Sequence, residues 1–364
     1  MHQPRAPIRL RHWAGSVLPV LAVGTALGAS ALLIWASGTS VLIAYGSLLE
    51  GMLGSGRAVV ETGVSATPYL LTGLAVAVSF RGGLFNIGAE GQLYMGALCA
   101  AMVGYSVTGM PRLIHLPLAL MAGAAGGAVW GVIPGWLKAR RGAHEVINTI
   151  MMNYVAIKLV DYLVKNVIRD PTASLDRTPY ILTTAQLPRL LGPEYRLHAG
   201  VLLALAAVGG TAWLLAKTTY GFVLQTVGSN PQAARYAGMP VARTIILTMT
   251  SSGALAGLAG AGEVLGLHHT LLATFSSGYG FDAIAVALLA KSRPFGIIPA
   301  ACLWGGLRNG AGLMQVRTGM SIDLITMMQA LVIVGLAAEP LIRWLYRLSP
   351  RSMADVAFTR GWGR

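Results

Sequence analysis

The chain has 364 residues, of which 55% are hydrophobic and 11% are charged, and its formal net charge is +14. A soluble domain carries about a quarter charged residues, so this composition excludes a water-soluble surface of this size. A charge of +14 would also suit a nucleic-acid-binding protein, but Lys and Arg fall in short connections between apolar blocks. That distribution is typical of a membrane protein oriented by positive charge on its cytoplasmic side.

The apolar blocks set the fold class. Most are close to the roughly 20 residues that a helix needs to cross a hydrocarbon core about 30 Å thick, and 46 glycines suit helices that pack closely in lipid. We therefore predict an all-α, polytopic membrane helix bundle with about ten transmembrane helices (range eight to ten). The segment 279–290 is short enough to be a broken or re-entrant helix. The predicted spans are 15–37, 64–80, 86–106, 114–137, 145–164, 198–216, 244–266, 279–290, 296–315 and 321–341.

The orientation follows from the basic residues, which place both termini in the cytoplasm. The basic start resembles a secretory signal, but the apolar run at 15–37 is too long for one and lacks a clear cleavage site, so we expect a retained span. We predict a cytoplasmic basic N-terminus (1–14), a single transmembrane domain (15–341) and a cytoplasmic basic tail (342–364). The residues predicted on the cytoplasmic side include Lys138, Arg140, Arg141, Lys217, Arg235, Arg243, Lys291, Arg293, Arg343, Arg347, Arg351, Arg360 and Arg364.

Two connections on the opposite, outer side are long. Residues 38–63 have apolar side chains at helical spacing with polar interruptions, which predicts an amphipathic helix on the outer surface. Residues 165–197 contain four prolines and mixed charge, which predicts an irregular outer loop. This loop is either a contact for an extracytoplasmic partner or a plain solvated connection.

Motifs for catalysis are missing from the sequence. There is no GxxxxGK[ST], no HExxH and no Cys/His cluster with metal-ligand spacing. We therefore expect no catalytic residue, no metal and no cofactor bound by this chain. A membrane-embedded enzyme is a further hypothesis, but the sequence offers no candidate pair of nucleophile and base for it. Any energy source must therefore lie outside this chain. An ion gradient usually leaves acidic or His residues in mid-membrane. The alternative is a partner ATPase docked on a cytoplasmic loop, and the sequence favours this second source.

The most unusual segment is 80–92, FRGGLFNIGAEGQ, where polar residues lie among glycines at the join of two apolar blocks. Glycines weaken a continuous helix, and a helix break in a membrane is tolerated only inside protein or beside an aqueous cavity. One interpretation is a plain cytoplasmic turn. The other is a structural elbow beside a translocation path, with Glu90 hydrogen-bonded to neighbouring helices and Asn86 or Gln92 facing the path.

Three further polar residues lie in predicted spans. Asn148 and Asn153 are five residues apart, about 140° around a helix, so they need not face one path. Asp282 lies at the start of the short span at 279–290. Each is either a path residue or a structural hydrogen-bond partner, because a buried polar group in lipid costs a few kcal/mol unless it is paired.

A second polar segment, residues 219–240, lies between two spans on the cytoplasmic side. SNPQAARYAG predicts a short helix with Ser229 or Asn230 as N-cap, Pro231 at the first helical position and Gly238 as the C-terminal stop. Such a compact helix is either a surface helix or one that docks into a groove of a soluble protein.

Four ordered motifs give the chain a family resemblance. They are TPYLLTGLAVAVSFRGGLFNIGAEGQLYMGA (67–97), HEVINTIMMNYVA (144–156), TTYGFVLQTVGSNPQAARYAGM (218–239) and FDAIAVALLAKSRPFGIIPAACLWGGL (281–307). Together they resemble the permease subunits of bacterial ABC importers of the simple-sugar, nucleoside and branched-chain amino-acid superfamily, most of all the nucleoside-type members.

The resemblance implies a multi-pass protein of the bacterial inner membrane that imports nucleosides or a related sugar-bearing solute. It implies three kinds of partner: a second permease copy or a sister permease, cytoplasmic ATPase subunits that use ATP and Mg, and an extracytoplasmic substrate-binding lipoprotein. The loop 217–243 would be the coupling loop to the ATPase. An ion-gradient-driven transporter and an ABC permease for simple sugars or branched-chain amino acids are the alternatives. The matching coupling positions are Gly221, Gly228, Asn230, Ala233, Ala234 and Gly238.

Overall fold

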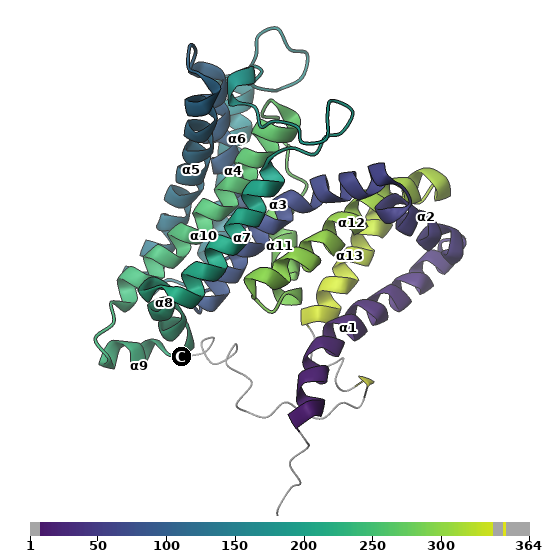
Figure 1. Cartoon of the computed structure of the whole chain (residues 1–364), viewed down its shortest axis with the longest axis horizontal. Coiled ribbons are helices and arrows are strands. Elements are labelled where there is room, and N and C mark those ends of the chain that lie inside the picture. The colour runs from purple at the N-terminus through teal and green to yellow at the C-terminus, as the bar shows by residue number, and fades with distance from the viewer. Residues whose placement is uncertain (1–7, 338–344, 347–364) are drawn as a thin grey trace, which may run out of the picture. The chain divides into compact units, whose positions relative to one another are not determined.

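The computed structural model describes residues 8–337 and 345–346, and this part of the chain is α-helical without a β-strand (Figure 1). The predicted all-α class is confirmed. The predicted tail 342–364 lies almost wholly outside the described residues, as does the start of the predicted N-terminal segment. The helices are α1 (Ile8–Ala36), α2 (Val41–Leu53), α3 (Gly56–Arg81), α4 (Ala89–Ser106), α5 (Arg112–Arg141), α6 (Glu145–Asn166), α7 (Gly200–Lys217), α8 (Thr219–Ser229), α9 (Pro231–Tyr236), α10 (Val241–Glu263), α11 (Tyr279–Leu289), α12 (Pro294–Thr318) and α13 (Ile322–Ala337).

Length and composition make several of these helices candidates for membrane spans. Among the described residues, five are long and apolar enough to cross a bilayer: α3, α5, α6, α7, and α10 with the π-helical turn Val264–His268 that continues it. Shorter apolar helices occur at Val23–Ala36, Val41–Leu53 and Tyr279–Leu289. Each of the ten predicted spans overlaps a helix within the described residues, so the prediction of a polytopic bundle is confirmed.

The described residues divide into two compact units, one of residues 8–58 with 307–337 and 345–346, the other of residues 59–306. In the first unit, α2 packs against the C-terminal part of α12. A Cβ on Gly51 would lie 2.8 Å from the Cα of Gly310, and Asn309 Nδ2 donates to the carbonyl oxygens of Gly51 and Ala58, at 2.8 and 3.1 Å. Arg317 forms an ion pair with Glu50. The opposite face of α2 exposes Leu42 and Leu49.

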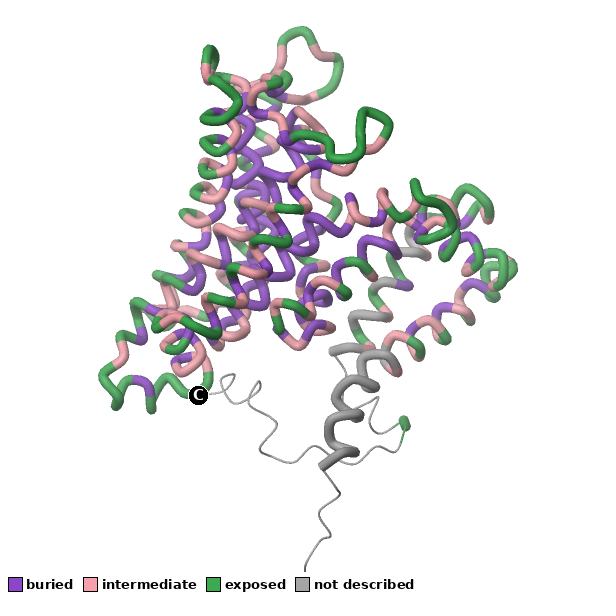
Figure 2. The backbone as a smooth tube through the Cα atoms, viewed as in Figure 1, coloured by how far each residue is buried: buried purple, intermediate pink, exposed green. Residues whose placement is uncertain are grey.

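The core of the second unit is formed by α4, α5 and α10 (Figure 2). Glycines bring these helices into backbone contact: a Cβ on Gly127 would lie 2.2 Å from the carbonyl oxygen of Gly253, and one on Gly96 would lie 2.3 Å from the Cα of Gly257. Small residues at helix crossings allow this close approach in lipid, where dispersion contacts replace the hydrophobic effect as the driving force. The core is therefore held by backbone proximity more than by large side chains.

Two helices of this unit begin part-way across it. The 26 residues of α3 span about 39 Å, and Tyr69 lies at the middle of that length. Tyr69 Oη donates to Asp282 Oδ2 at 2.9 Å, so the first turn of α11 starts level with the centre of α3. The first turn of α4 contacts α6 at Asn153, well inside α6. The chain before each of these helices, 82–88 and 269–278, is largely non-helical at this depth.

Candidate coupling surface and translocation elbow

The predicted short helix in the loop 217–243 is present as α9. Asn230 is its N-cap, because its Oδ1 accepts from the Ala233 N–H at 3.0 Å, and Pro231 occupies the first helical position. At the other end Gly238 has φ +77°, and the Met239 N–H donates to the Ala234 carbonyl oxygen at 2.9 Å. This pair of features is a Schellman stop, in which glycine avoids the strain of a left-handed residue.

The two sides of α9 have different surroundings. Ala234 is fully buried in an apolar cluster with Val227 and Val241. Ala233 is exposed, and Tyr236 is 94% exposed. Of the two predicted coupling alanines, Ala234 thus packs α9 against the rest of the unit. Ala233 lies on the exposed side of α9, here called its free face. The sequence prediction did not include Tyr236. The one feature of the sequence that could have indicated it is its position at the end of the predicted helix, beside Arg235.

The glycines of α8 sit against backbone. A Cβ on Gly221 would lie 2.1 Å from the Leu214 carbonyl oxygen of α7, and one on Gly228 would lie 2.2 Å from the Arg81 carbonyl oxygen at the end of α3. Arg81 in turn donates from Nε to the Ser292 carbonyl oxygen at 3.0 Å, in the turn between α11 and α12. The loop that carries α9 is therefore joined through Arg81 to the connection after α11.

The elbow after α3 is a buried polar network. Asn86 and Gln92 are 0% and 1% exposed. Asn86 Nδ2 donates to Gln92 Oε1 at 3.0 Å and to Ser252 Oγ at 2.9 Å, and Ser252 Oγ donates to the Ala75 carbonyl oxygen at 2.6 Å. The network joins α3, α4 and α10 at the point where the backbone leaves its helical path, and a helix break at membrane depth needs such enclosure within protein. Asn86 and Gln92 face this network in the present conformation.

Asn153 of α6 holds the same elbow from the other side. Its Oδ1 accepts from the Gly91 N–H at 2.8 Å and its Nδ2 donates to the Ile87 carbonyl oxygen at 2.8 Å. Asn148, five residues earlier, has its Nδ2 buried without a hydrogen-bond partner among the described residues. The two asparagines therefore have different surroundings, and Asn153 alone of the pair joins the elbow.

Glu90 links the two helices that begin part-way across the unit. It lies in the first turn of α4, is 2% exposed, and its Oε2 accepts from the Gly280 N–H of α11 at 2.6 Å. The N–H groups at the start of a helix have no partner within it, and a carboxylate is favourable there because of the helix dipole. Glu90 thus caps α11, while Asp282 lies on that helix's half-exposed side.

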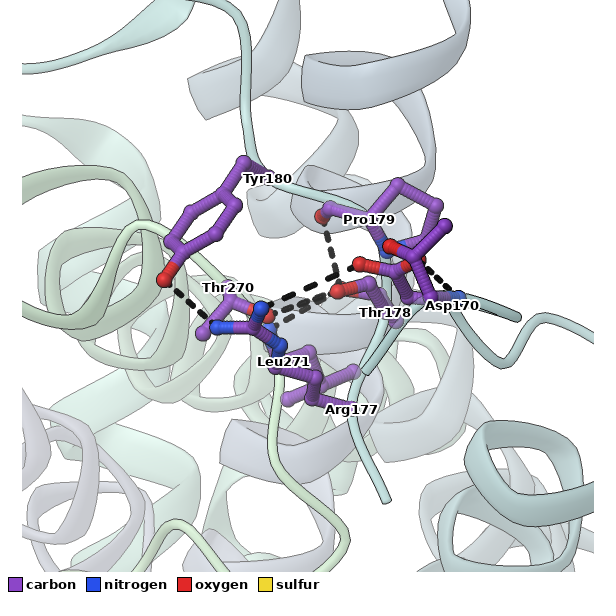
Figure 3. A network of polar contacts seen from close by, with 8 residues as sticks. Asp170, Arg177, Thr178, Pro179, Tyr180, Thr270 and Leu271 are labelled. Carbon is purple, nitrogen blue, oxygen red and sulfur yellow. Dashed lines mark hydrogen bonds and ion pairs between the residues drawn. The ribbon is translucent and has the colours of Figure 1, made fainter. Parts of the chain in front are cut away.

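The connection 165–197, predicted to lie on the outer side, is irregular and forms hydrogen bonds with the chain that follows α10 (Figure 3). Thr178 Oγ1 accepts from the Leu271 N–H at 3.0 Å, and Thr270 Oγ1 donates to the Thr178 carbonyl oxygen at 2.8 Å. Arg177 lies between Tyr180, 4.3 Å from the ring centroid, and Asp170, with a 3.9 Å ion-pair contact. Hydrogen bonds from Thr172 lower the pKa of Asp170, which keeps that carboxylate charged.

These features define the class of the protein as a multi-pass membrane protein whose bundle contains interrupted helices and a capped helix outside the span region. Residues 58–337 match the family described as branched-chain amino acid transport system / permease component. The chain belongs to this permease family, which confirms the resemblance drawn from the four sequence motifs.

Several relatives cover nearly the whole chain. It is 44% identical to the guanosine ABC transporter permease protein NupP of Bacillus subtilis (strain 168), over 90% of this chain and 95% of that one. It is 35% identical to a glucose ABC transporter permease protein of Haloferax volcanii, over 89% and 87%. It is 34% identical to the nucleoside ABC transporter permease protein NupB of Lactococcus lactis, over 89% and 91%. Each organism also has a second matching permease, 24% to 28% identical to this chain.

Proposed function

We propose that this chain is the transmembrane subunit of an ATP-driven importer that moves nucleosides, or a related sugar-bearing solute, across the bacterial inner membrane. The observation that carries the proposal is the 44% identity to a guanosine permease across 95% of that protein. The nucleoside permease at 34% identity supports the same substrate class. Alternating access by this bundle would be biased by the nucleotide state of a partner, as in other two-state switches.

The proposal assigns ATP hydrolysis to other chains. A cytoplasmic ATPase subunit would bind ATP and Mg, an extracytoplasmic lipoprotein would deliver the solute, and this chain would hold no cofactor. For the second permease we favour a different, sister chain over a second copy. Support comes from the three organisms that each contain two matching permeases, one of 34% to 44% and one of 24% to 28% identity.

Contact with the ATPase is assigned to α9. A helix of six residues is too short to be stable by itself, yet α9 has a side-chain cap, a Schellman stop and the buried Ala234 beneath it. These features hold its free face, with Ala233 and Tyr236, in one conformation without burying it. Motion received at this face would pass through Gly228 to Arg81 and so to the connection after α11.

The test is uptake of labelled guanosine into vesicles with ATP inside, with the sister permease, the ATPase and the lipoprotein present. We expect uptake that disappears when the ATPase is omitted or when ATP is replaced by a non-hydrolysable analogue. A parallel experiment with a proton or sodium gradient in place of ATP distinguishes an ATP-driven importer from a secondary transporter. Uptake by this chain alone, driven by such a gradient, would show a secondary transporter and overturn the proposal.

Simple-sugar import is the second candidate, because the glucose permease of Haloferax volcanii is 35% identical to this chain. The same vesicles distinguish the two substrates. Excess unlabelled glucose should leave guanosine uptake unchanged if nucleosides are the solute, whereas labelled glucose uptake without guanosine uptake would favour the sugar.

A further inference from the structure

The end of the connection before α11 and the first turn of α11 leave the polar residues Ser277 and Asp282 exposed and half-buried, at the level where α4 begins. Phe275 lies 4.8 Å from Tyr94 of α4, ring centroid to ring centroid, and the Gly280 N–H bonds to Glu90. Ser277 lies between these two points in the sequence, so it is close to the level at which α4 begins. Ser277 is nevertheless exposed, as is Phe281 at 41%, and Asp282 is half-buried.

Ser277 is an exposed residue in a non-helical stretch, and non-helical backbone at this level would not be compatible with contact to lipid. Lipid tails cannot satisfy free N–H and C=O groups, so such backbone occurs only inside protein or against a water-filled cavity. A carboxylate such as Asp282 is also costly in lipid and faces the bundle interior or an aqueous path. The surface of Ser277, Phe281 and Asp282 is here called the mid-depth face.

The mid-depth face is anchored by hydrogen bonds before it in the chain and within it. Before it, Thr178 of the 165–197 connection exchanges hydrogen bonds with Thr270 and Leu271. Within it, Glu90 caps α11 through Gly280, and Tyr69 Oη donates to one oxygen of Asp282. A surface fixed in this way has the pre-organisation expected of a site that contacts a ligand.

We propose that the mid-depth face lines the solute path and is a transient contact site for a ring-bearing polyol such as a ribonucleoside. This inference rests on the proposed function and adds the residues that meet the solute. The Asp282 carboxylate can accept hydrogen bonds from neighbouring sugar hydroxyls. The exposed Phe281 ring offers a flat apolar surface to a base or to the carbon face of a sugar. Ser277 supplies a hydroxyl that both donates and accepts.

The proposal also separates the polar residues predicted for the path. Asn86, Gln92 and Asn153 are buried and paired with the chain itself. Glu90 is buried against α11. These four position the elbow, whereas Asp282 is half-buried and belongs to the mid-depth face with the exposed Ser277 and Phe281.

The test is cysteine labelling in the complete transporter after Cys99 and Cys302 are replaced by Ala. Ser277→Cys and Phe281→Cys are treated with a charged, membrane-impermeant thiol reagent, with and without solute. The solute is guanosine or glucose, whichever the uptake assay shows to be transported. The matched control is Ala285→Cys, on the same helix but 0% exposed. We expect both path variants to react, at least threefold more slowly with solute, and the control to stay unlabelled.

Uptake is measured on the same vesicles so that failure of the path assignment can be told apart from failure of the proposed function. If Ser277→Cys and Phe281→Cys do not react in either the nucleotide-free or the vanadate-trapped state while ATP-driven uptake persists, the path assignment is wrong and the proposed function stands. Reaction that solute does not slow also contradicts solute contact, and a disulfide between Ser277→Cys and a neighbouring permease would make the face a subunit interface. Loss of ATP dependence in uptake would instead contradict the proposed function.

Asp282→Asn is a second, independent variant that keeps a side chain able to accept from Tyr69. We expect it to raise the solute concentration for half-maximal uptake about tenfold, since the carboxylate is the stronger acceptor for sugar hydroxyls. The ATP dependence of uptake should remain. An unchanged half-maximal concentration would remove Asp282 from the path.

Discussion

Gly228 at the end of α8 and Arg81 at the end of α3 are in backbone contact, such that a Cβ on residue 228 would lie 2.2 Å from the Arg81 carbonyl oxygen. The contact continues to Gly83, whose own Cβ would lie 2.7 Å from the Gly228 carbonyl oxygen and whose φ is +70°. The loop that carries α9 and the elbow thus meet where neither has room for a side chain. A displacement of α8 must move the elbow with it.

Gly228→Ala should therefore impair coupling. The added methyl group forces α8 away from the elbow, and overpacking of this kind costs about 1–3 kcal/mol. We expect the assembled complex to retain most of its ATPase activity while ATP-driven uptake falls at least fivefold. Uptake and ATPase activity are measured in the same proteoliposomes, and their ratio reports coupling.

Gly210→Ala is the matched control for this variant. Gly210 lies in α7, and a Cβ there would meet no atom of the described residues within 4 Å. Alanine is favoured over glycine in a helix by about 0.5–1 kcal/mol, so this variant should be neutral or slightly stabilising. Equal uptake by Gly228→Ala and Gly210→Ala would show that the contact with Arg81 does not transmit motion.

The N-cap of α9 gives a second prediction. Asn230→Ala removes the acceptor of the Ala233 N–H, and the loss of an N-cap costs about 1 kcal/mol. Because α9 has only six residues, we expect faster hydrogen exchange at 233–239 and a several-fold loss of uptake. Asn230→Ser keeps a capping oxygen and should restore both. Unchanged exchange in Asn230→Ala would mean that burial of Ala234 holds the helix without the cap.

Local features of the fold could be predicted from sequence because they depend on neighbouring residues. The cap and stop of α9 are specified by Asn230, Pro231 and Gly238, and the spans by apolar block length. The break before Glu90 was also predictable from the run of glycines. The role of each residue as coupling or path residue remains a prediction.

Contacts between distant residues could not be predicted in this way. Ser252 is 166 residues from Asn86, and Gly228 is 147 residues from Arg81. Nothing near either residue in the chain indicates its partner, because close approach of two helices depends on how the whole bundle packs. For the same reason Asn148 and Asn153 look alike in the sequence, and only packing shows which one faces the elbow.

That difference between the asparagines is the basis of a third prediction. Asn153→Ala would leave the Gly91 N–H and the Ile87 carbonyl without their partner, and each buried group left unpaired costs about 1–3 kcal/mol. We expect a marked loss of thermal stability in detergent. Asn148→Ala removes a buried Nδ2 that has no partner among the described residues and should change stability little. Similar melting temperatures for the two variants would contradict the clamp role of Asn153.

His269, which follows the π-helical turn after α10, gives the last prediction. Burial, with the nearby positive charge of Arg189, lowers the pKa of His269 below its ordinary 6.5. On acidification the unfolded chain therefore binds a proton at His269 at a higher pH than the folded chain does. The contribution of neutral His269 to the free energy of unfolding is fully present above pH 6.5 and is lost as the pH falls below that value.

His269 has φ +53°, a left-handed conformation that Asn tolerates well. His269→Asn thus removes the titrating ring without added backbone strain. We expect its melting temperature to fall less than that of the wild type between pH 7.5 and 5.5.

The control is His144→Gln, at an exposed residue before α6, which should keep the wild-type pH dependence. If His269→Asn and the wild type lose the same stability on acidification, protonation of His269 does not destabilise the fold.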